Sequence, residues 1–243
     1  MILGAMQPYF FPYLGYFDLI NRTDRWIVFD TPQYMREGWV NRNRILHSRE
    51  GWQYIIVPLK KHSRETAIHQ VEAVEFPDWR RKIINQFTHY RGRAPYYRET
   101  IALLEDCFAG QERNLSRLNV HCLGKICRYL GIPWAPEIFS EMNLALGPVR
   151  EAAEWALRIA EAAGATEYLN PPGGTSLYDA ERFARHGIRL VIQEDFNFEY
   201  HCGPYAYVPK LSVLDAVMWA SPAEIKAHLD RVKAAATQLT ATC

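Results

Sequence analysis

The stretch that most constrains the fold is Gln7–Gly15, which carries two prolines, a glycine and four aromatic residues. It follows the apolar run Ile2–Met6, which predicts a buried strand, and precedes Tyr16–Ile20, which predicts the first turns of a helix. A second strand is predicted at Arg25–Asp30. Because each proline fixes φ and removes an amide donor, we expect a rigid loop. Ligands of open α/β sheets bind beyond the carboxyl ends of the strands, so this loop predicts one wall of a ligand site.

Three residues of this loop are candidate ligand contacts. Gln7 and Tyr9 follow the first strand, and we expect their amide and phenol groups to line a pocket. Gly15 stands at the start of the predicted helix, where a missing side chain allows close approach of a neighbour or a ligand. The alternative interpretation is an aromatic connection that plugs the end of the sheet.

The charge balance bears on the classes of partner. The 243 residues include 28 Lys or Arg and 27 Asp or Glu, a net charge of +1, so no global field attracts nucleic acid or acidic membranes. The sequence shows no secretory signal pattern and no apolar run of membrane-spanning length. We therefore expect a soluble cytoplasmic protein with no nucleic acid as a stable partner and no membrane association.

The cysteines and the absence of several known motifs exclude some kinds of site and some classes of enzyme. The five cysteines form no CxxC pair and their number is odd, which argues against a disulfide framework and a structural zinc site. The sequence also lacks a Ser elbow, a metal-ligand cluster and a Rossmann fingerprint, which argues against a metallohydrolase or a dehydrogenase. We expect neither a metal nor a cofactor.

A polar segment, Thr31–Ile45, follows the second predicted strand. Arg42 and Arg44 each offer a planar fork of donors that suits a carboxylate or a phosphate, and Asn41 and Asn43 each carry a donor and an acceptor. We therefore predict that Asn41, Arg42 and Asn43 contact the substrate. In an extended chain, Asn41 and Asn43 would face one side, and Arg42 and Arg44 the other. The alternative is a solvated β-ribbon with charged edges.

Predicted strands and helices alternate at both ends of the chain. Further strands are expected at 54–59, 166–169 and 188–192, an extended segment at 133–139, and helices at 78–90, 99–108, 115–130, 148–163 and 176–186, with a final helix pair. Asn114 and Gly131 are expected to cap the two ends of the helix between them. This pattern predicts an α/β, Rossmann-like layered fold with a mainly parallel sheet and helices on both faces. We expect a single domain over 1–243, with a helical segment around 78–130 and a frayed C-terminal tail from Ala234.

The turn at Gly173–Gly174 lies between a predicted strand and a helix N-terminus, where backbone N–H groups can hold an anion. Gly174 and the nearby Tyr178 are therefore candidate substrate contacts. The alternative, a tight turn with no further role, fits equally well.

Three carboxylates near serines have a structural explanation. Asp179, Asp215 and Glu224 each lie three residues after a serine, which is the spacing of a helix capping box. We predict that they serve as caps and not as catalytic acids.

A second aromatic, irregular segment, 193–211, follows the last predicted strand. We expect it to meet the Gln7 loop over the same edge of the parallel sheet and to enclose a cavity with it. Tyr200 is a candidate substrate contact, His201 a candidate base and Cys202 a candidate nucleophile. Adjacent residues of an extended chain point in opposite directions, so His201 is a poor partner for Cys202, and a plain pocket thiol is the alternative.

Four motifs resemble the WbqC-like protein family. They are Gln7–Phe17, Trp39–Ile45, Val57–Leu59 and Leu211–Asp215. The likeness extends from the N-terminus to about residue 220, and it identifies the chain as a divergent member. It implies a bacterial cytoplasmic protein linked with surface-polysaccharide clusters, such as those for O-antigen, or with specialised metabolites.

The chain departs from the family pattern in three places. Tyr200-His-Cys202 stands where members tend to carry Tyr-x-Gln, and Tyr168–Gly174 replaces a Tyr-Leu-Ser-Gly type of turn. Members also tend to have Asn and Gly near Trp219 and Ser221. The first two departures lie in the expected pocket and indicate a substrate that differs from a typical member's.

The opening segment is also distantly similar to nucleotidyltransferases of the His-x-Gly-His kind. Here Gly15-Tyr-Phe17 stands in place of the histidine-bearing pair. Without these imidazoles, the usual stabilisation of a phosphoryl transition state is missing, so nucleotidyl transfer is the alternative function.

The sequence favours a transferase that moves an acyl or aminoacyl group from an activated thioester or ester to an amine of an amino sugar or related small metabolite. Asp30 or His201 would act as the base, and Cys202 is a candidate for covalent catalysis. The expected partners are a small-molecule substrate and, as a donor, a carrier protein or another activated acyl compound. A non-catalytic module that binds a small molecule or a carrier protein is a further alternative.

Overall fold

The computed structural model of the chain describes residues 1–75, 78–144, 146–147 and 149–241. For residues 174–176 and 239–241 it describes the backbone alone. None of the helices in these ranges combines the length and the apolar character that a membrane span requires.

The centre of the molecule is a five-stranded sheet in which every neighbouring pair is parallel. Its strands are β1 (Ile2–Met6), β2 (Arg25–Val28), β5 (Pro136–Ile138), β6 (Glu167–Asn170) and β7 (Arg189–Ile192). Their order is β5-β2-β1-β6-β7, so the chain builds outward from β1 in one direction and then continues on its other side with β6. This order confirms the predicted α/β, Rossmann-like fold with a mainly parallel sheet.

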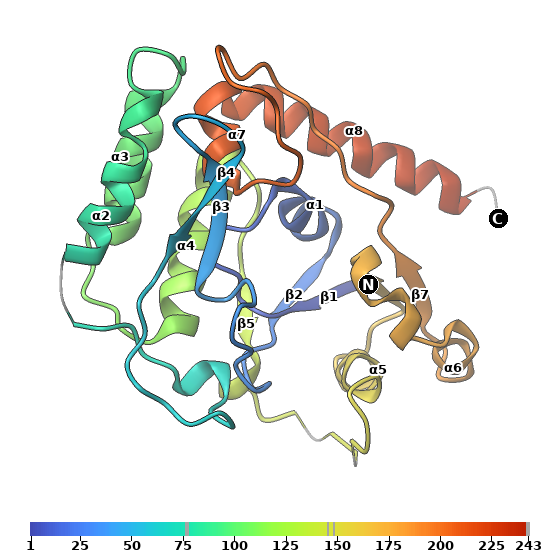
Figure 1. Cartoon of the computed structure of the whole chain (residues 1–243). Coiled ribbons are helices and arrows are strands. Elements are labelled where there is room, and N and C mark those ends of the chain that lie inside the picture. Colours follow the sequence, from blue (N-terminus) through green and yellow to red (C-terminus); the bar gives the residue numbers. More distant parts are fainter. Residues whose placement is uncertain (76–77, 145, 148, 242–243) are drawn as a thin grey trace.

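Helices cover both faces of the sheet, as Figure 1 shows. One face packs against α5 (Glu154–Ala162) and α6 (Ala180–Arg185), and the other lies toward α1 (Leu14–Arg22), α4 (Leu115–Leu130) and α8 (Pro222–Ala241). Strand residues alternate between the two cores: Leu3 and Ala5 belong to the core with α5, whereas Trp26 and Val28 belong to the other. Gly4 faces the Trp26 indole so closely that a Cβ would lie 2.7 Å from the ring, and only glycine fits there.

The predicted helical segment around 78–130 forms three helices on one side of the sheet (Figure 1). They are α2 (Asp78–Gln86), α3 (Tyr97–Phe108) and α4, with the 3₁₀ turn η2 (Thr88–Tyr90) after α2. The predicted caps of α4 are confirmed, because the Asn114 side chain accepts a hydrogen bond from the Arg117 amide at 3.0 Å and Gly131 adopts the left-handed conformation. Two further helices close the chain, α7 (Val213–Trp219) and α8.

One predicted strand belongs to a different sheet. The segment expected at 54–59 is β4 (Trp52–Ile56), which pairs antiparallel with β3 (Arg42–Leu46) in a separate two-stranded ribbon. Instead, β5 pairs with β2 at the edge of the central sheet, in the segment that the sequence predicted only as extended. Prolines at 133 and 136 obscured that strand.

Several boundaries also shift. The helix expected from Pro148 begins at Glu154, and Pro148 itself lies outside the described residues. The helix expected at 176–186 divides into the 3₁₀ helix η4 (Pro172–Leu177) and α6. Helix α8 continues through the stretch after Ala234, which we expected to be frayed.

The loop between β1 and α1 is held by hydrogen bonds to its own carbonyl groups. Five of the six carbonyls from Gln7 to Pro12 accept such bonds: Gln7 from the Tyr16 hydroxyl (2.9 Å), Pro8 from Asn119 Nδ2 (2.7 Å), Phe10 from Asn43 Nδ2 (3.0 Å), Phe11 from the Ser212 hydroxyl (2.8 Å) and Pro12 from the Val213 amide (2.9 Å). The donors come from α1, α4, β3 and the start of α7. Phe11 keeps a φ of 41°, which is unfavourable for a bulky residue and persists because the surroundings fix it. We call Gln7–Tyr13, with these bonds, the clamped loop.

Replacing Asn119 tests the clamp. Its Nδ2 donates to both Pro8 O and Val40 O at 2.7 Å, and the residue is fully buried. Asn119→Ala leaves two carbonyls without a donor, and we expect a loss of about 2–3 kcal/mol in the free energy of unfolding. A melting temperature roughly 5–10 °C lower follows for a chain of this size. The matched control, Asn197→Ala on the surface, is expected to stay within about 0.5 kcal/mol of the unsubstituted protein. Equal melting temperatures for Asn119→Ala and the control would show that the clamp is dispensable.

Candidate functional site

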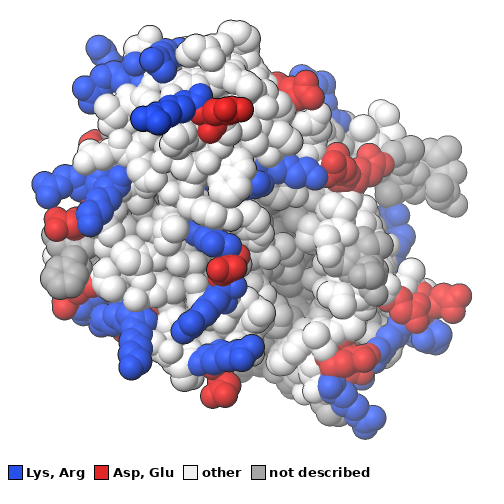
Figure 2. Space-filling model, in the orientation of Figure 1, with Lys and Arg blue, Asp and Glu red and all other residues white. Residues whose placement is uncertain are grey.

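A large cavity lies at the carboxyl ends of β1, β2 and β6. Strands β1 and β6 are neighbours whose onward connections run to opposite sides of the sheet, and this is where open α/β sheets bind ligands. The cavity has a volume of about 820 Å³, within the range of small-molecule sites. Its walls come from the clamped loop, from residues 29–44 and from the connection after β6. Figure 2 shows a hollow in the face that carries the ribbon in Figure 1, with Lys and Arg side chains along one side.

The lining of this cavity is aromatic and amide-rich. Its aromatic side chains include Tyr9, Tyr13, Tyr16, Phe29, Trp155 and Tyr178, and its amides include Gln7, Asn43 and Asn170. Two cationic side chains, Arg44 and Lys210, also reach it. Among the described residues that line it there is no carboxylate, thiol or imidazole. Such a lining favours an anionic ligand that presents flat or apolar groups to the walls.

Arg44 is the most distinctive group of the site. Its guanidinium contacts two indoles, with its Cζ 5.4 Å from the ring centre of Trp39 and 5.2 Å from that of Trp52. It forms no ion pair with any described Asp or Glu, and its Nε is buried without a hydrogen-bond partner. Its Nη2 makes one long contact, 3.4 Å, to the Lys210 carbonyl. Arg44 therefore presents a fixed positive charge with donors still available to a ligand.

Lys210 adds a second positive charge, which Asp195 partly neutralises. Its φ of 57° places it in the left-handed region, and its ammonium group pairs with Asp195. Both side chains of this pair are largely exposed, so the pair contributes little to stability and can open for a ligand.

The phenols of the cavity remain protonated at neutral pH. Burial raises the pKa of Tyr9 and of Tyr178 above the ordinary tyrosine value. Burial also raises the pKa of Tyr13, and the charges of Asp195 and Asp18 add to the effect. These hydroxyls can therefore donate hydrogen bonds to a developing negative charge, but they are poor bases.

The structure brings four of the predicted substrate contacts to this cavity: Gln7, Tyr9, Asn43 and Tyr178. The Asn43 amide donates to the clamped loop and is largely committed to it. Gly174 lies in η4 next to Gly173, which lines the cavity.

The other predicted contacts do not line the cavity. A Cβ at Gly15 would lie 2.3 Å from the ring of Tyr13, so the close approach that this glycine permits is to a neighbour. Asn41 is engaged with the Tyr34 hydroxyl (2.8 Å) and the Val57 carbonyl (3.0 Å). Arg42 lies over the Tyr54 ring at 4.3 Å, on the outer side of the ribbon.

Asp30, the first candidate base, has a structural role. It is almost fully buried, and its carboxylate accepts hydrogen bonds from the Ser140 amide (2.9 Å), the Ser140 hydroxyl (2.8 Å) and the Ser116 hydroxyl (3.2 Å). These bonds join the end of β2 to α4 and to the 3₁₀ turn η3 (Phe139–Glu141). Asp30 is absent from the described lining of the cavity, and this geometry does not favour a role as base.

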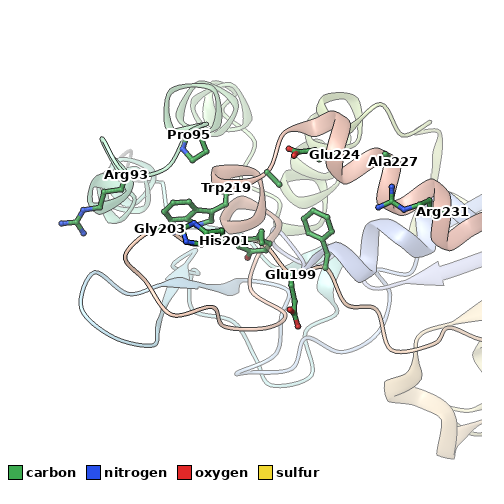
Figure 3. A pocket seen from close by; sticks show the side chains of 12 residues that line it. Arg93, Pro95, Glu199, His201, Gly203, Trp219, Glu224, Ala227 and Arg231 are labelled. Carbon is green, nitrogen blue, oxygen red and sulfur yellow. The ribbon is translucent and has the colours of Figure 1, made fainter.

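His201 and Tyr200 lie at a second cavity, of about 700 Å³, between the 193–211 segment and α8. Figure 3 shows that its charged side chains diverge, with Arg93 and Arg231 at opposite ends and Glu199 pointing away. His201 is exposed, and its Nδ1 accepts a hydrogen bond from the Gly203 amide at 3.2 Å. This cavity does not gather groups around a common point.

Cys202 is buried and contacts the Tyr200 carbonyl at 3.6 Å. Burial, followed by the nearby charge of Asp215, raises the pKa of its thiol to about 12. At neutral pH the thiolate is negligible, so this environment favours the plain thiol over the nucleophile.

The capping prediction for Asp215 is wrong. Its carboxylate is fully buried and accepts hydrogen bonds from the Tyr90 hydroxyl, the Tyr200 hydroxyl (2.7 Å) and the Leu46 amide (3.2 Å). Burial raises the pKa of Asp215, and burial together with this carboxylate raises the pKa of both phenols well above the usual value. The cluster joins β3, η2 and α7 inside the core, and Ser212 caps α7 without Asp215.

The other two predicted caps differ from each other. Glu224 forms a capping box, because it accepts from the Ser221 amide (2.8 Å) and hydroxyl (2.6 Å) while its own amide donates to Ser221. Asp179 is itself the N-cap residue of α6 and accepts from the Glu181 and Arg182 amides.

The two tyrosine-rich segments are neighbours, but the large cavity does not lie between them. Tyr13 and Leu14 face Phe196 and Tyr200 across a crevice of only about 20 Å³. Of the second segment, only Lys210 is among the described residues that line the large cavity. The other wall belongs to the connection after β6.

Sequence reasoning missed Trp39, Trp155 and Lys210 as site residues, and it considered Arg44 as an anion-binding side chain without placing it among the substrate contacts. The alternation in Thr31–Ile45 did separate Arg44 from Asn43, and Trp39 lies close by in the sequence, which was a usable signal. Trp155 occurs in an ordinary amphipathic helix and carries no such signal. Among the described residues, no group of three or more His, Cys, Asp or Glu could hold a metal ion.

Comparisons with known proteins place the chain within a family. A model of the WbqC-like protein family matches residues 7–227. A Mycobacterium tuberculosis protein named "Uncharacterized protein Rv1507c" is 30% identical over 215 residues, which is 88% of this chain and 91% of that protein. No solved structure matches the chain.

The raised pKa of Cys202 predicts an inert thiol. We expect native protein at pH 8 to show no alkylation of Cys202 by iodoacetamide, and the rate to keep rising with pH beyond 11, because the thiolate forms only near the thiol's pKa of about 12. Peptide mapping by mass spectrometry, with urea-unfolded protein as the positive control, measures this. Alkylation within minutes at pH 8, or a rate that levels off near pH 9, would contradict the prediction.

Proposed function

Because the chain belongs to the WbqC-like protein family, we propose that the cavity at the carboxyl ends of β1, β2 and β6 is the substrate site of a transferase. The enzyme moves an acyl or aminoacyl group from an activated thioester or ester to an amine. The acceptor is an amino sugar or a related small metabolite, in cytoplasmic biosynthesis of surface polysaccharides or specialised metabolites.

One observation carries this proposal: the guanidinium of Arg44, which has no described carboxylate partner, reaches a cavity with no carboxylate among its described lining residues. Activated acyl donors commonly bear phosphate or carboxylate groups, and a preoriented guanidinium binds both with paired hydrogen bonds. The indoles of Trp39 and Trp52 hold this group in place before the ligand arrives, which reduces the entropy lost on binding.

The chemistry of the lining suits attack by an amine on an activated acyl group. The amine nitrogen forms a bond to the acyl carbon, the bond to the leaving sulfur or oxygen breaks, and the proton lost by nitrogen reaches the leaving group through solvent. The protonated phenols of Tyr9 and Tyr178 donate to the oxyanion that forms in between. Holding both substrates in contact lowers the barrier by up to about 7–11 kcal/mol.

This mechanism works without a side-chain base. Asp30 and His201, the candidates from the sequence, are not among the described lining residues, and Cys202 is a buried thiol. An amine is already nucleophilic in its neutral form, so orientation and oxyanion stabilisation supply the catalysis.

The same lining supports a second candidate, a non-catalytic module that binds an anionic small molecule. The observation in its favour is that no carboxylate, thiol or imidazole is found among the described lining residues. Nucleotidyl transfer draws its support from the N-terminus of α1, where the first turn has no acidic residue and Tyr13 forms no side-chain cap.

Substitution of Arg44 tests the proposal. We expect acyl-coenzyme A and acyl-pantetheine phosphate thioesters to raise the melting temperature, and Arg44→Gln to weaken their binding at least tenfold, because a charged hydrogen bond contributes about 1.5–3 kcal/mol. Isothermal titration measures the affinity, and a coupled thiol-release assay with amino sugars measures turnover. Arg98→Gln, an exposed arginine of α3, is the matched control and is expected to bind normally.

The outcomes separate the candidates. Equal affinities for Arg44→Gln and Arg98→Gln would overturn the role of Arg44. Thioester binding without turnover on any amine would favour the binding module. Stabilisation by ATP or CTP alone would favour nucleotidyl transfer.

A further inference from the structure

The outer side of the β3–β4 ribbon carries a connected set of cationic and apolar side chains. We propose that this surface docks an acidic carrier protein, which presents the acyl group as a thioester on a long flexible arm and delivers it to the cavity. The inference rests on the proposed function. We call Arg42, Arg44, Trp52, Tyr54 and Ile56 the ribbon face.

The pairing of the strands sets the ribbon face. Arg42 lies opposite Ile56 and Arg44 opposite Tyr54, whereas the intervening pair Asn43 and Ile55 is buried. Side chains that alternate with buried ones point to the opposite side of the ribbon. The ribbon is separate from the central sheet, and this side is open to solvent at Trp52 (40% exposed) and Ile56 (45% exposed).

The ribbon face is preorganised by contacts between cations and rings. Arg42 lies 4.3 Å from the Tyr54 ring centre, Arg44 lies 5.2 Å from that of Trp52, and the Trp52 and Tyr54 rings meet edge to face at 4.8 Å. Neither arginine forms an ion pair with a described carboxylate. Aromatic residues and arginine are the types that dominate protein interface energetics.

The segment of the sequence that contains the ribbon carries an excess of positive charge. Residues 31–66 contain seven Lys or Arg and three Asp or Glu, a net of +4, although the whole chain has a net charge of only +1. The remainder of the chain is therefore at −3. Figure 2 shows Lys and Arg side chains on the face that carries the ribbon. A field of this sign favours an acidic partner and accelerates its association.

The apolar component favours a protein over a nucleic acid. Ile56 and, in the adjoining loop, Met35 (60% exposed) are aliphatic, and such side chains neither stack on bases nor bind phosphate. Exposed aliphatic groups among arginines and aromatics match the apolar core of a protein interface.

The ribbon face is continuous with the cavity. Arg44 belongs to both, and Trp39, which stacks on Arg44, also lines the cavity. A protein docked on the ribbon face therefore stands beside the cavity, where a tethered thioester can enter while the protein stays outside. A free small molecule would need no surface beyond the cavity itself.

Binding of an acyl carrier protein tests the inference. The probe is acetyl-loaded acyl carrier protein, with acetyl-pantetheine phosphate as the small-molecule counterpart. We expect the carrier to bind, its affinity to fall at least tenfold between 0.05 and 0.3 M salt, and Arg42→Glu and Ile56→Glu each to weaken it at least tenfold. Ile56 is exposed and Arg42 is half-buried, so circular dichroism checks that each variant is folded. Arg98→Glu on α3 is the matched control and is expected to bind normally.

The small-molecule counterpart separates docking from the cavity. We expect Ile56→Glu to leave binding and turnover of acetyl-pantetheine phosphate unchanged, because Ile56 is not among the described lining residues. If the carrier fails to bind, or binds the Arg42→Glu and Ile56→Glu variants normally, the docking inference is wrong even where the small thioester is turned over. If neither form of thioester binds or is turned over, the proposed function fails as well.

Two further outcomes would assign a different partner to the ribbon face. Binding of transfer RNA that is lost in Arg42→Glu, with no carrier binding, would identify a nucleic-acid surface. Sedimentation as a dimer that Ile56→Glu dissociates would identify a contact between two copies of the chain. Either result overturns docking of a carrier.

Discussion

The clamped loop depends on donors that it does not itself possess. Its two prolines lack amide hydrogens, so its carbonyls take hydrogen bonds from Asn43, Asn119, Ser212 and other groups far away in the sequence. Four elements of the fold are thereby joined to one loop. Because the loop is fixed from several sides, it tolerates the positive φ of Phe11 and presents its outer residues as a preformed wall.

The ionisable groups of the protein fall into two sets, those buried in the core and those that line the cavity. The carboxylates of Asp30 and Asp215 are buried, and each holds several elements together through hydrogen bonds. Cys202 lies in the core with a raised pKa. The groups left to the cavity are phenols, amides and two cations, a set suited to holding an anion and stabilising an oxyanion. The proposed function therefore depends on binding and orientation, and not on proton abstraction by a carboxylate.

Local signals in the sequence predicted much of the fold. Strands β1 and β2, the caps of α4 and the parallel βαβ arrangement all follow from short patterns of apolar residues, prolines and caps. Strand β5 was not predicted, because prolines are rare inside strands and this one is stabilised by its pairing with β2. The ribbon was foreseen as an alternative, but its separation from the central sheet depends on long-range packing. Asp215 fits a capping box by spacing, and only the fold brings Tyr90 and Tyr200 to its carboxylate. Likewise, Trp155 gains its place in the site from tertiary structure alone.

The most direct test of the central claim is a crystal structure of the protein with the anionic thioester that stabilises it most. We predict that the ligand lies in the cavity beyond β1, β2 and β6, with its anionic group within hydrogen-bond distance of the Arg44 guanidinium and its acyl carbonyl facing Tyr9 or Tyr178. A ligand bound instead in the cavity beside His201, or one whose anionic group lies away from Arg44, would contradict it.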